Sequence, residues 1–498
     1  MTEHVQVAVL GAGFAGIGMA VALLRRGTTD FVVLERASAV GGTWRDNTYP
    51  GCACDVPSHL YSFSFAPNPD WSHSFSRQPE IQAYLERTAE QHGVVPHVRF
   101  GTEVVAATWE EDHRWWRLQT SSGELTASVV VSGCGGLVEP ALPAVPGLES
   151  FEGTAFHSAR WDHGADLDGK RVGVVGTGAS AIQFVPHLQR RVAQLTVFQR
   201  TAPWVLPRTD RRITGVERAA FRRFPALQRL LRGGVYAGRE LQLLSFTGKG
   251  RFRAMGEKGG LRHLATAVPD PALREVLTPR FRLGCKRILL SNDYYPALAQ
   301  PNVTVVPHGV REVRARSVVA ADGSEHDVDV LVFGTGFHVM DLPVAARLTG
   351  RSGQTLAEHW AEGKSAHRGT TVAGFPNLFL LLGPNTALGH SSVVFMIECQ
   401  IAYVLAALDA LDAAGGGAVD VRPQAQAAYN AQVQAGLATT VWSEGGCKAW
   451  YTDARGHNFT LWPGHLGAFR RSTARFDAES YVLTPPVTPP RAAGLPAA

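Results

Sequence analysis

Two glycine-rich turns hold the residues best suited to chemistry in this chain. The first places Gly11, Gly13 and Gly16 in the pattern GxGxxG, and the second places Gly176 and Gly178 in the same pattern, with Ala181 at its third position. Glycines at such places let the backbone approach a pyrophosphate, and the N-terminus of a following helix attracts its charge. A chain that binds a dinucleotide at each turn can pass electrons between them, which indicates a flavin-dependent oxidoreductase.

A charged residue follows each turn, 24 positions after its first glycine: Glu35 in the first unit and Arg200 in the second. An acid in this place suits the free 2′-hydroxyl of a ribose, whereas an arginine suits a 2′-phosphate. We therefore expect FAD at the first turn and NADPH at the second. The alternative is that Arg200 is only a solvated strand end.

The elements needed to position these turns can be seen in the hydrophobic pattern. Short apolar strands are expected over 6–10 and 31–34, with a helix between them that stops at Gly27. The second unit repeats this order, with strands over 171–175 and 195–198 around a helix over 182–188. Each unit is thus a strand–turn–helix–strand unit of the dinucleotide-binding type.

The order of the remaining segments predicts a discontinuous first domain. Pro140, Pro143 and Pro146 mark a linker, and apolar strands are expected over 328–333 and 377–382. The predicted fold class is α/β, with two Rossmann-like dinucleotide-binding domains of the flavoprotein monooxygenase/disulfide reductase type. The predicted division is 1–140 for the first part of the FAD domain, 141–340 for the NADP domain, and 341–498 for the second part and a C-terminal wrap. A helical insertion is expected at about 210–282.

Composition excludes several classes of function. The 498 residues predict two or three domains. The net charge of +5 does not indicate a nucleic-acid partner. Six cysteines are too few for a disulfide framework, so reduced thiols in a cytoplasmic protein are expected. Cys52 and Cys54 lack the spacing of a redox dithiol or of a zinc site, and no metal is expected.

Two segments, one apolar and one basic, have compositions that also occur in membrane-contacting proteins. The apolar run over 391–408 contains Glu398 and Gln400, so a buried helix is expected rather than a stable membrane insertion. The stretch 211–263 holds thirteen Lys or Arg against three Glu. Its apolar residues recur at helical spacing, which predicts a helical lid with a solvated basic face. Contact with a membrane surface or an acidic substrate is the alternative.

Two longer motifs carry a family resemblance. Phe151, Gly153, His157, Trp161 and Asp162 fit the pattern F-x-G-x-x-x-H-x-x-x-W-[PD], and a second pattern runs from Gly41, Gly42 and Trp44 through Tyr49-Pro50-Gly51 to Asp55. With both nucleotide units, these motifs make the chain resemble the type I Baeyer–Villiger monooxygenases, which are class B flavoprotein monooxygenases. The resemblance covers about residues 5 to 480. The chain departs from many members at His338, where they have Asp.

The resemblance implies a reaction. NADPH reduces FAD, reduced FAD and O2 give a C4a-peroxyflavin, and this species inserts one oxygen atom next to a ketone carbonyl to form an ester or lactone. The implied partners are a small-molecule ketone and O2. Cyclic, linear, aromatic and polycyclic ketones all stay open, as does the oligomeric state.

The resemblance also implies roles for single residues. Arg287 would stabilise the negative charge of the reacting groups, and Asp55 would orient Arg287. The implied FAD contacts are Gly11, Gly13, Gly16, Glu35, Thr43, Trp44, Asp55, Tyr61, Val104 and Val393. The implied NADPH contacts are Thr177, Gly178, Ala179, Ser180, Gln183, Arg200, Thr201, Lys286 and Trp450. His157 is expected to set the hinge between the domains rather than to act as a base.

Two other functions are compatible with two nucleotide sites on one chain. An N- or S-oxygenating flavin-containing monooxygenase shares the architecture, but Trp161, Asp162 and Arg287 argue against it. A flavoprotein that only transfers electrons would not require Arg287, Asp55 and the long motif together.

Overall fold

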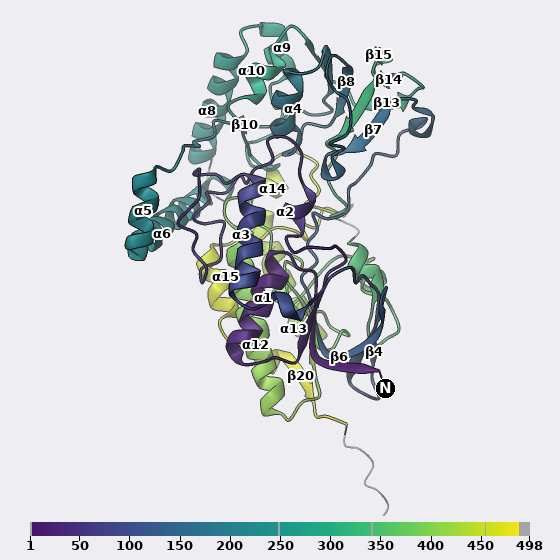
Figure 1. Cartoon of the computed structure of the whole chain (residues 1–498), viewed down its shortest axis with the longest axis vertical. Helices are drawn as coiled ribbons and strands as arrows, with labels where there is room; N and C mark the ends of the chain where they lie inside the picture. Colours follow the sequence, from purple (N-terminus) through teal and green to yellow (C-terminus); the bar gives the residue numbers. More distant parts are fainter. Residues whose placement is uncertain (1, 248–249, 340–341, 454, 488–498) are drawn as a thin grey trace, which may run out of the picture.

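The computed structural model describes residues 2–247, 250–339, 342–453 and 455–487. Two α/β bodies lie one above the other in Figure 1, and the chain passes between them more than once. The lower body contains the N-terminal strand β1 (Glu3–Leu10) and the helix α1 (Phe14–Arg26). The upper body contains β8 (Arg171–Val175) and α4 (Ala181–Gln189). The expected fold class is confirmed, because both bodies are built around parallel strands with a glycine turn before a helix.

The lower body is built on an eight-stranded mixed sheet. Its order is β17-β4-β5-β6-β1-β2-β3, and β18 pairs with β6 in addition. The central strands β1 and β2 are parallel and mostly buried, as expected for strands covered on both faces. Strands β17 and β18 come from far along the chain, so residues beyond 340 complete a sheet that the first 132 residues begin. The members not yet bounded are β2 (Phe31–Leu34), β3 (Val98–Arg99), β4 (Val104–Glu110), β5 (Trp115–Thr120), β6 (Gly123–Ser132), β17 (Leu348–Thr349) and β18 (Leu378–Leu380).

The upper body is built on a five-stranded parallel sheet of order β12-β9-β8-β16-β7. Its other strands are β7 (Thr154–His157), β9 (Gln194–Phe198), β12 (Val303–Val306) and β16 (Val330–Phe333). A small antiparallel sheet of β13 (Val310–Val313), β14 (Ser317–Ala320) and β15 (Glu325–Asp327) adjoins it. Strand β7 holds the middle of the long motif, up to His157, and it forms one edge of this sheet.

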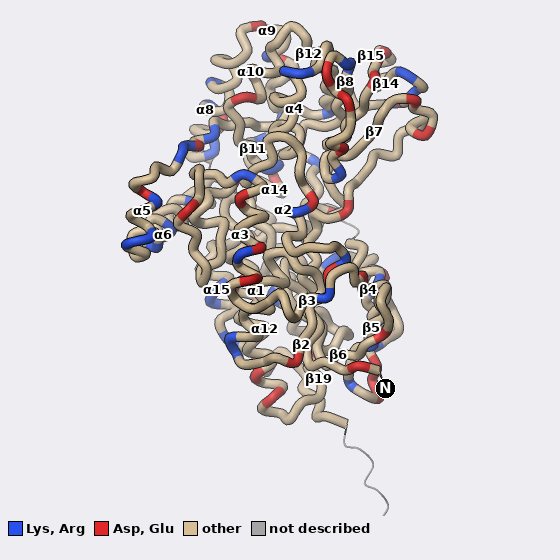
Figure 2. Tube along the Cα trace, in the orientation of Figure 1, with Lys and Arg blue, Asp and Glu red and all other residues tan. Residues whose placement is uncertain are grey.

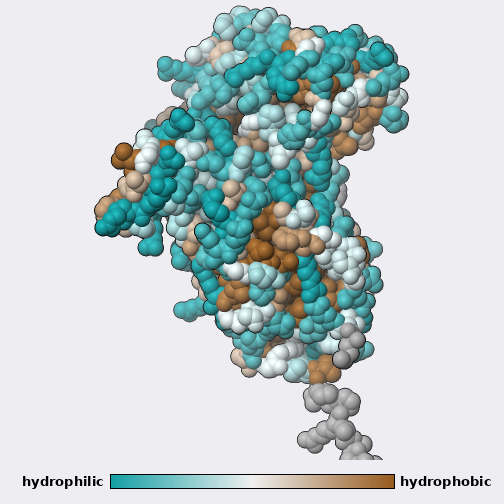
Figure 3. Space-filling view, in the orientation of Figure 1, coloured by the Kyte–Doolittle hydropathy of each residue, from teal (hydrophilic) through white to brown (hydrophobic). Residues whose placement is uncertain are grey.

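The basic stretch is helical, as predicted. It forms α5 (Gly215–Arg223), α6 (Pro225–Gln242), α7 (Leu244–Thr247) and α8 (Arg251–Ala267), followed by α9 (Pro271–Val276). Helix α5 begins with a capping box between Thr214 and Glu217, which satisfies its first backbone N–H groups. Helices α5 and α6 project from the side of the molecule in Figure 1, and Figure 2 shows basic residues along them. In Figure 3 the projecting tip carries hydrophobic atoms among hydrophilic ones.

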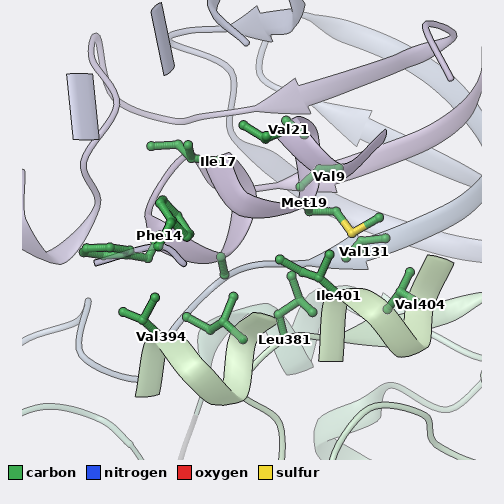
Figure 4. Packing of buried hydrophobic residues seen from close by; sticks show 14 of the residues in the cluster. Val9, Phe14, Ile17, Met19, Val21, Val131, Leu381, Val394, Ile401 and Val404 are labelled. Carbon is green, nitrogen blue, oxygen red and sulfur yellow. The ribbon is translucent and has the colours of Figure 1, made fainter. Parts of the chain in front are cut away.

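The core of the lower body lies between α1 and the long helix α12 (Val393–Ala413). Figure 4 shows side chains of α1, among them Ile17 and Met19, in one buried cluster with Val394, Ile401 and Val404 of α12. Helix α12 is, among the described residues, the one helix long and apolar enough to cross a membrane, but 56% of its most apolar window is buried in the protein. The buried helix expected over 391–408 is therefore present.

The C-terminal part wraps back on the lower body. Helix α13 (Pro423–Ala438) and the short α14 (Val441–Glu444) are followed by α15 (Leu466–Thr473), and β20 (Tyr481–Thr484) pairs with β19 (Ala418–Val421). The predicted domain boundary at residues 340 and 341 and the end of the predicted C-terminal wrap, 488–498, lie outside the described residues. The predicted division into three ranges stays a prediction.

Candidate active site

Arg287 and Asp55 form a bidentate ion pair. Arg287 lies just before β11 (Leu289–Leu290), and Asp55 lies in the loop between α2 (Thr43–Asp46) and α3 (Gln78–Gln91). Nε and Nη2 of Arg287 donate to Oδ2 and Oδ1 of Asp55, each over 2.7 Å. Burial opposes the charged carboxylate, but the Arg287 charge and hydrogen bonds outweigh it and lower the pKa of Asp55. The Asp55 charge raises the pKa of Arg287 in turn, so both groups stay ionised.

The loop that carries Asp55 is fastened to the upper body. The side-chain oxygen of Gln183, on α4, accepts from the Tyr49 hydroxyl at 3.0 Å and from the Ala53 N–H at 3.2 Å. Its nitrogen donates to the Ala53 carbonyl at 3.0 Å. Arg208 adds a bond from Nη2 to the Cys54 carbonyl at 3.0 Å. The ion pair therefore sits where the two bodies meet.

These bonds give Gln183 a role that the sequence did not reveal. Gln183 was expected to help cradle the NADPH pyrophosphate, yet its amide is engaged with residues 49–53. The same contact explains Gly51, whose φ is +81° and whose added Cβ would lie 2.7 Å from the Gln183 carbonyl oxygen. A contact from Gln183 to pyrophosphate stays a prediction.

Three further groups approach the ion pair, and none was expected from the sequence. Nη1 of Arg287 lies 3.5 Å from the Leu388 carbonyl. The buried Tyr451 phenol has its pKa raised to about 12 by burial, which outweighs the Arg287 charge and a hydrogen bond from the Arg287 backbone. The charge of Arg239, on α6, helps to lower the pKa of Asp55. Tyr451 follows the predicted Trp450, and Arg239 lies in the basic stretch. These positions were the only indications in the sequence that either residue lies near the ion pair.

An apolar wall adjoins these residues. Phe246 of α7 stacks on Trp442 of α14, with ring centroids 5.4 Å apart. Gly284 and Gly389 both approach Phe246 so closely that an added Cβ would lie 2.9 and 3.2 Å from its ring. Phe246 and Trp442 belong to the same buried apolar cluster as Cys285 and Ile288, so this wall packs against the turn that carries Arg287.

The second nucleotide turn brings its predicted cations together. Burial, and next the charge of Arg200, lower the pKa of Lys286, so the two cations lie close enough to interact. The hydroxyl of Thr177 donates to the Thr201 carbonyl at 3.3 Å, which ties the glycine turn to the end of β9. Gly176 has a φ of +107°, and a Cβ there would lie 2.4 Å from the Gly334 oxygen. Gly178, Ala179 and Ser180 complete the turn before α4. The arrangement fits a phosphate group.

The first turn is equally tight. An added Cβ on Gly16 would lie 1.8 Å from the Gly11 carbonyl oxygen, so only glycine fits there. Gly13, by contrast, meets nothing closer than 3.7 Å, which leaves a cradle of backbone at the start of α1. Glu35 is buried and accepts from the N–H groups of Ala12 at 2.8 Å and Ala37 at 2.9 Å. Glu35 thus fixes the turn itself, and a bond from it to a ribose stays a prediction.

The other residues predicted for FAD lie in the lower body. Nε1 of Trp44 donates to the Tyr61 hydroxyl at 3.0 Å, and Thr43 is the first residue of α2. Val104 begins β4, and its carbonyl already accepts from Nη1 of Arg347 at 2.8 Å. Val393 is the first residue of α12, and the buried Ser391 hydroxyl beside it has no partner among the described residues. An unsatisfied hydroxyl at a helix N-terminus fits a polar cofactor edge.

Trp450 lies at the margin of this region. Its side chain meets Tyr451 edge-on at 4.5 Å between ring centroids, and 44% of the residue is exposed. His157 ends β7, and its Nδ1 accepts from the Ala159 N–H at 3.1 Å. His157 thus belongs both to the upper sheet and to the long motif, and its role at the hinge stays a prediction.

One expectation about cysteine is wrong. All six thiols were expected to be reduced, but Cys285 and Cys447 form a disulfide, with Cα atoms 6.1 Å apart. Pairing across 162 residues leaves no local trace in the sequence, which is why the count of cysteines alone misled. Cys52, Cys54, Cys134 and Cys399 are free, and burial raises the pKa of the Cys52 thiol to about 12. Among the described residues, no group of three or more His, Cys, Asp or Glu is placed to hold a metal ion.

Known proteins resemble this chain over nearly all of its length. Residues 4–231 match the family model described as flavin-binding monooxygenase-like. A Baeyer-Villiger monooxygenase of Streptomyces coelicolor is 55% identical over 97% of this chain and 93% of its own length. A protein of the same name from Pseudomonas aeruginosa is 49% identical over 97% of this chain and 92% of its own.

Solved structures extend the similarity to three dimensions. A closed crystal structure of cyclohexanone monooxygenase superposes with a TM-score of 0.87 at 28% identity, over 97% of this chain and all of that one. A structure named as an OTEMO complex with FAD and NADP gives a TM-score of 0.87 at 26% identity, with the same coverage.

Proposed function

The chain belongs to the Baeyer–Villiger monooxygenase family, and on that premise we propose how its residues divide the work of the reaction. The protein is an FAD- and NADP-dependent oxidoreductase that oxidises ketones with O2. The balanced reaction takes ketone, O2, NADPH and a proton to ester or lactone, water and NADP+. The N- or S-oxygenating alternative is not favoured by these similarities.

The bidentate pair of Arg287 and Asp55 is the observation that carries the proposal. Addition to a ketone carbonyl places negative charge on the ketone oxygen, and a fixed cation beside it lowers the barrier. Arg287 cannot lose its proton, and Asp55 fixes the plane of its guanidinium. The third nitrogen, Nη1, makes only a long contact to the Leu388 carbonyl, so it is the nitrogen we assign to the substrate oxygen.

Bound FAD would supply the electron transfer between NADPH and O2 that the protein's side chains cannot. We assign its pyrophosphate to Gly11, Gly13 and the N-terminus of α1, and its ring system to the region of Thr43, Trp44, Tyr61 and Val393. The backbone cradle at Gly13 and the unsatisfied Ser391 hydroxyl support this assignment.

We assign NADPH to the upper body. Arg200, Lys286 and Thr201 would bind its 2′-phosphate, and the turn from Thr177 to Ser180 would bind its pyrophosphate. The support is that the two cations interact with each other and stand beside a glycine turn at a helix N-terminus. Trp450 would lie over the bound coenzyme.

We also propose that the enzyme acts in the cytoplasm without stable membrane insertion and without nucleic acid. The burial of α12 against α1 supports the absence of stable membrane insertion, and the small net charge supports the absence of a nucleic-acid partner.

The test is oxygen transfer by the purified holoenzyme with NADPH and ¹⁸O2. A panel should hold a cyclic, a linear, an aromatic and a polycyclic ketone together with a thioether and a tertiary amine, and products should be identified by mass spectrometry. We expect an ester or lactone that carries one ¹⁸O atom, formed at one equivalent per NADPH. Sulfoxide or N-oxide formation with no ester from any ketone would instead support the alternative function.

A further inference from the structure

The disulfide joins the two segments to which the proposed function assigns NADP contacts. Cys285 immediately precedes Lys286 and Arg287, and Cys447 lies three residues before Trp450. These segments are separated by more than 150 residues of chain, so little besides the disulfide and local packing holds them together. The disulfide therefore lies next to the candidate active site, where a change in its redox state would act on both segments.

The packing around the disulfide is close. The Arg282 N–H donates to the Gly445 carbonyl at 3.0 Å, and the Cys285 N–H donates to the Arg282 carbonyl at 3.1 Å. A Cβ on Gly445 would lie 2.6 Å from Cβ and 2.8 Å from Sγ of Cys285. The turn over 282–285 and the segment over 445–447 therefore touch directly, and the disulfide is the covalent link between them.

The two cysteine residues differ in exposure. Cys285 is buried, with 1% of its surface exposed. Cys447 is only partly buried and lies between the exposed residues Gly446 and Lys448. An external thiolate can therefore reach the Cys447 sulfur far more easily. The leaving group is then the Cys285 thiolate, which is adjacent in the chain to the cations Lys286 and Arg287. Nearby cations stabilise a thiolate and make it a better leaving group.

We propose that the Cys285–Cys447 disulfide is a redox modification site through which a dithiol reductant controls the hold of the enzyme on NADP+. A reductant thiolate attacks Sγ of Cys447 and breaks the S–S bond, and the second reductant thiol then resolves the mixed disulfide. The protein gains two electrons and two protons as two thiols, and the reductant leaves as its disulfide.

The disulfide restrains the segment after Gly445 next to Lys286, so its reduction changes how that segment moves. Without the disulfide, the exposed and partly exposed residues 446–450 are held beside Lys286 by the packing and the backbone bond at Gly445 described above, while the buried Tyr451 keeps its hydrogen bond from the Arg287 backbone. The segment then samples more conformations, and ordering it around NADP+ costs more free energy. This step rests on the proposed placement of Lys286 and Trp450 at NADP+. The presence of the disulfide and its accessibility to a reductant do not depend on that placement.

The first experiment counts thiols in the holoenzyme purified in air. The protein is denatured with a maleimide present, with or without prior dithiothreitol, and its mass is measured. We expect four labels before reduction and six after it, because four of the six cysteines are free. Six labels without reductant would overturn the proposal outright.

The second experiment measures NADP+ binding by calorimetry on native holoenzyme, before and after dithiothreitol. We expect reduction to weaken NADP+ binding on the order of five- to tenfold, at the low end of typical coupling between sites. Cys447→Ser should show the weakened value without reductant and no further change with it. Cys399→Ser, which removes a buried free thiol of α12, should keep the full response.

A third measurement separates this proposal from the proposed coenzyme site. Limited proteolysis, with cleavage sites mapped by mass spectrometry, reports on the segment 446–450 without any coenzyme. Faster cleavage there after reduction, with NADP+ affinity unchanged, would mean that the disulfide restrains the segment but that the coenzyme lies elsewhere, which overturns the regulatory claim. If reduction changes neither the cleavage rate nor the NADP+ affinity of the wild-type protein, the disulfide has a purely structural role and the proposal is overturned. If reduction weakens NADP+ binding in Cys447→Ser as much as in the wild type, the effect comes from another group, which also overturns the proposal.

Discussion

One edge of the Arg287 guanidinium meets the carboxylate of Asp55 through two hydrogen bonds of 2.7 Å, although the two residues are 232 positions apart in the chain. This geometry leaves the outer nitrogen Nη1 with only a 3.5 Å contact to the Leu388 carbonyl. A cation that is fixed on one edge and available on the other is suited to meet charge that develops during a reaction.

Removing Arg287 should separate coenzyme oxidation from oxygen transfer. Arg287→Ala should lower the rate of ester formation by about 10²- to 10³-fold, the usual effect of losing one group that stabilises a developing oxyanion. Anaerobic flavin reduction by NADPH should fall much less. Arg287→Lys keeps the charge but cannot pair with Asp55 bidentately, so it should recover only part of the rate.

The control for this series is Arg282→Ala. Arg282 lies five residues before Arg287, is more exposed, and pairs with Glu257. This variant should oxygenate ketones at close to the wild-type rate. Equal losses in flavin reduction and ester formation in Arg287→Ala would indicate a damaged fold or coenzyme site instead of a catalytic role.

Two glycines of the first turn should respond to alanine in opposite ways. Gly16→Ala forces a methyl group to within 1.8 Å of the Gly11 oxygen and should destabilise the apoprotein by at least about 3 kcal/mol. Gly13→Ala meets nothing within 3.4 Å and should melt like wild type as apoprotein, but it places the methyl group where we expect the pyrophosphate. Circular dichroism and the FAD content per chain test both. A Gly13→Ala enzyme that purifies with full FAD would place the pyrophosphate elsewhere.

Local features of the fold could be predicted because their causes are local. The glycines at 11, 16 and 176 are required by contacts or by a positive φ within their own strand–turn–helix unit, so their spacing reveals the two nucleotide turns. The helices of the basic stretch could be expected from hydrophobic periodicity, and the capping box of Thr214 and Glu217 that begins α5 is equally local.

The parts that escaped prediction depend on distant partners. The amide of Gln183 bonds to a loop 130 residues earlier, and Cys285 pairs with a cysteine 162 residues later. Nothing in the neighbouring residues distinguishes Gln183 from a pyrophosphate contact or Cys285 from a free thiol. Arg287 and Asp55 were named only through the family resemblance, and the distance between them could not be derived from sequence.

Coenzyme preference should depend on Arg200. Arg200→Gln removes the charge that we assign to the 2′-phosphate, so KM for NADPH should rise by about 10- to 100-fold, the range for a lost charge-assisted hydrogen bond. KM for NADH, which lacks this phosphate, should change little. Steady-state kinetics with both coenzymes measures the ratio. Arg190→Gln, which removes an exposed arginine at the end of α4, should leave the ratio unchanged. A parallel rise in both KM values would argue against a phosphate contact.

His157 should make the fold sensitive to mild acid. Burial, with a smaller effect of the Arg160 charge, lowers the pKa of His157 from 6.5 to about 4. Between these values the unfolded chain binds a proton that the folded chain does not, so the free energy of unfolding should decrease as pH falls through this window, by up to about 1.4 kcal/mol per pH unit. Above it His157 is neutral in both states and contributes no pH dependence.

Asn at position 157 can still accept from the Ala159 N–H but does not titrate, and it is a favoured residue for capping a helical turn. His157→Asn should therefore lose part of the acid sensitivity measured by urea unfolding at pH 7.5, 6 and 5. His163→Asn, at an exposed position in the following loop, should retain it. If His157→Asn and wild type lose stability in parallel from pH 7.5 to pH 5, then His157 is protonated in the folded protein as readily as in the unfolded chain, and its place in the long motif serves something other than a neutral hinge.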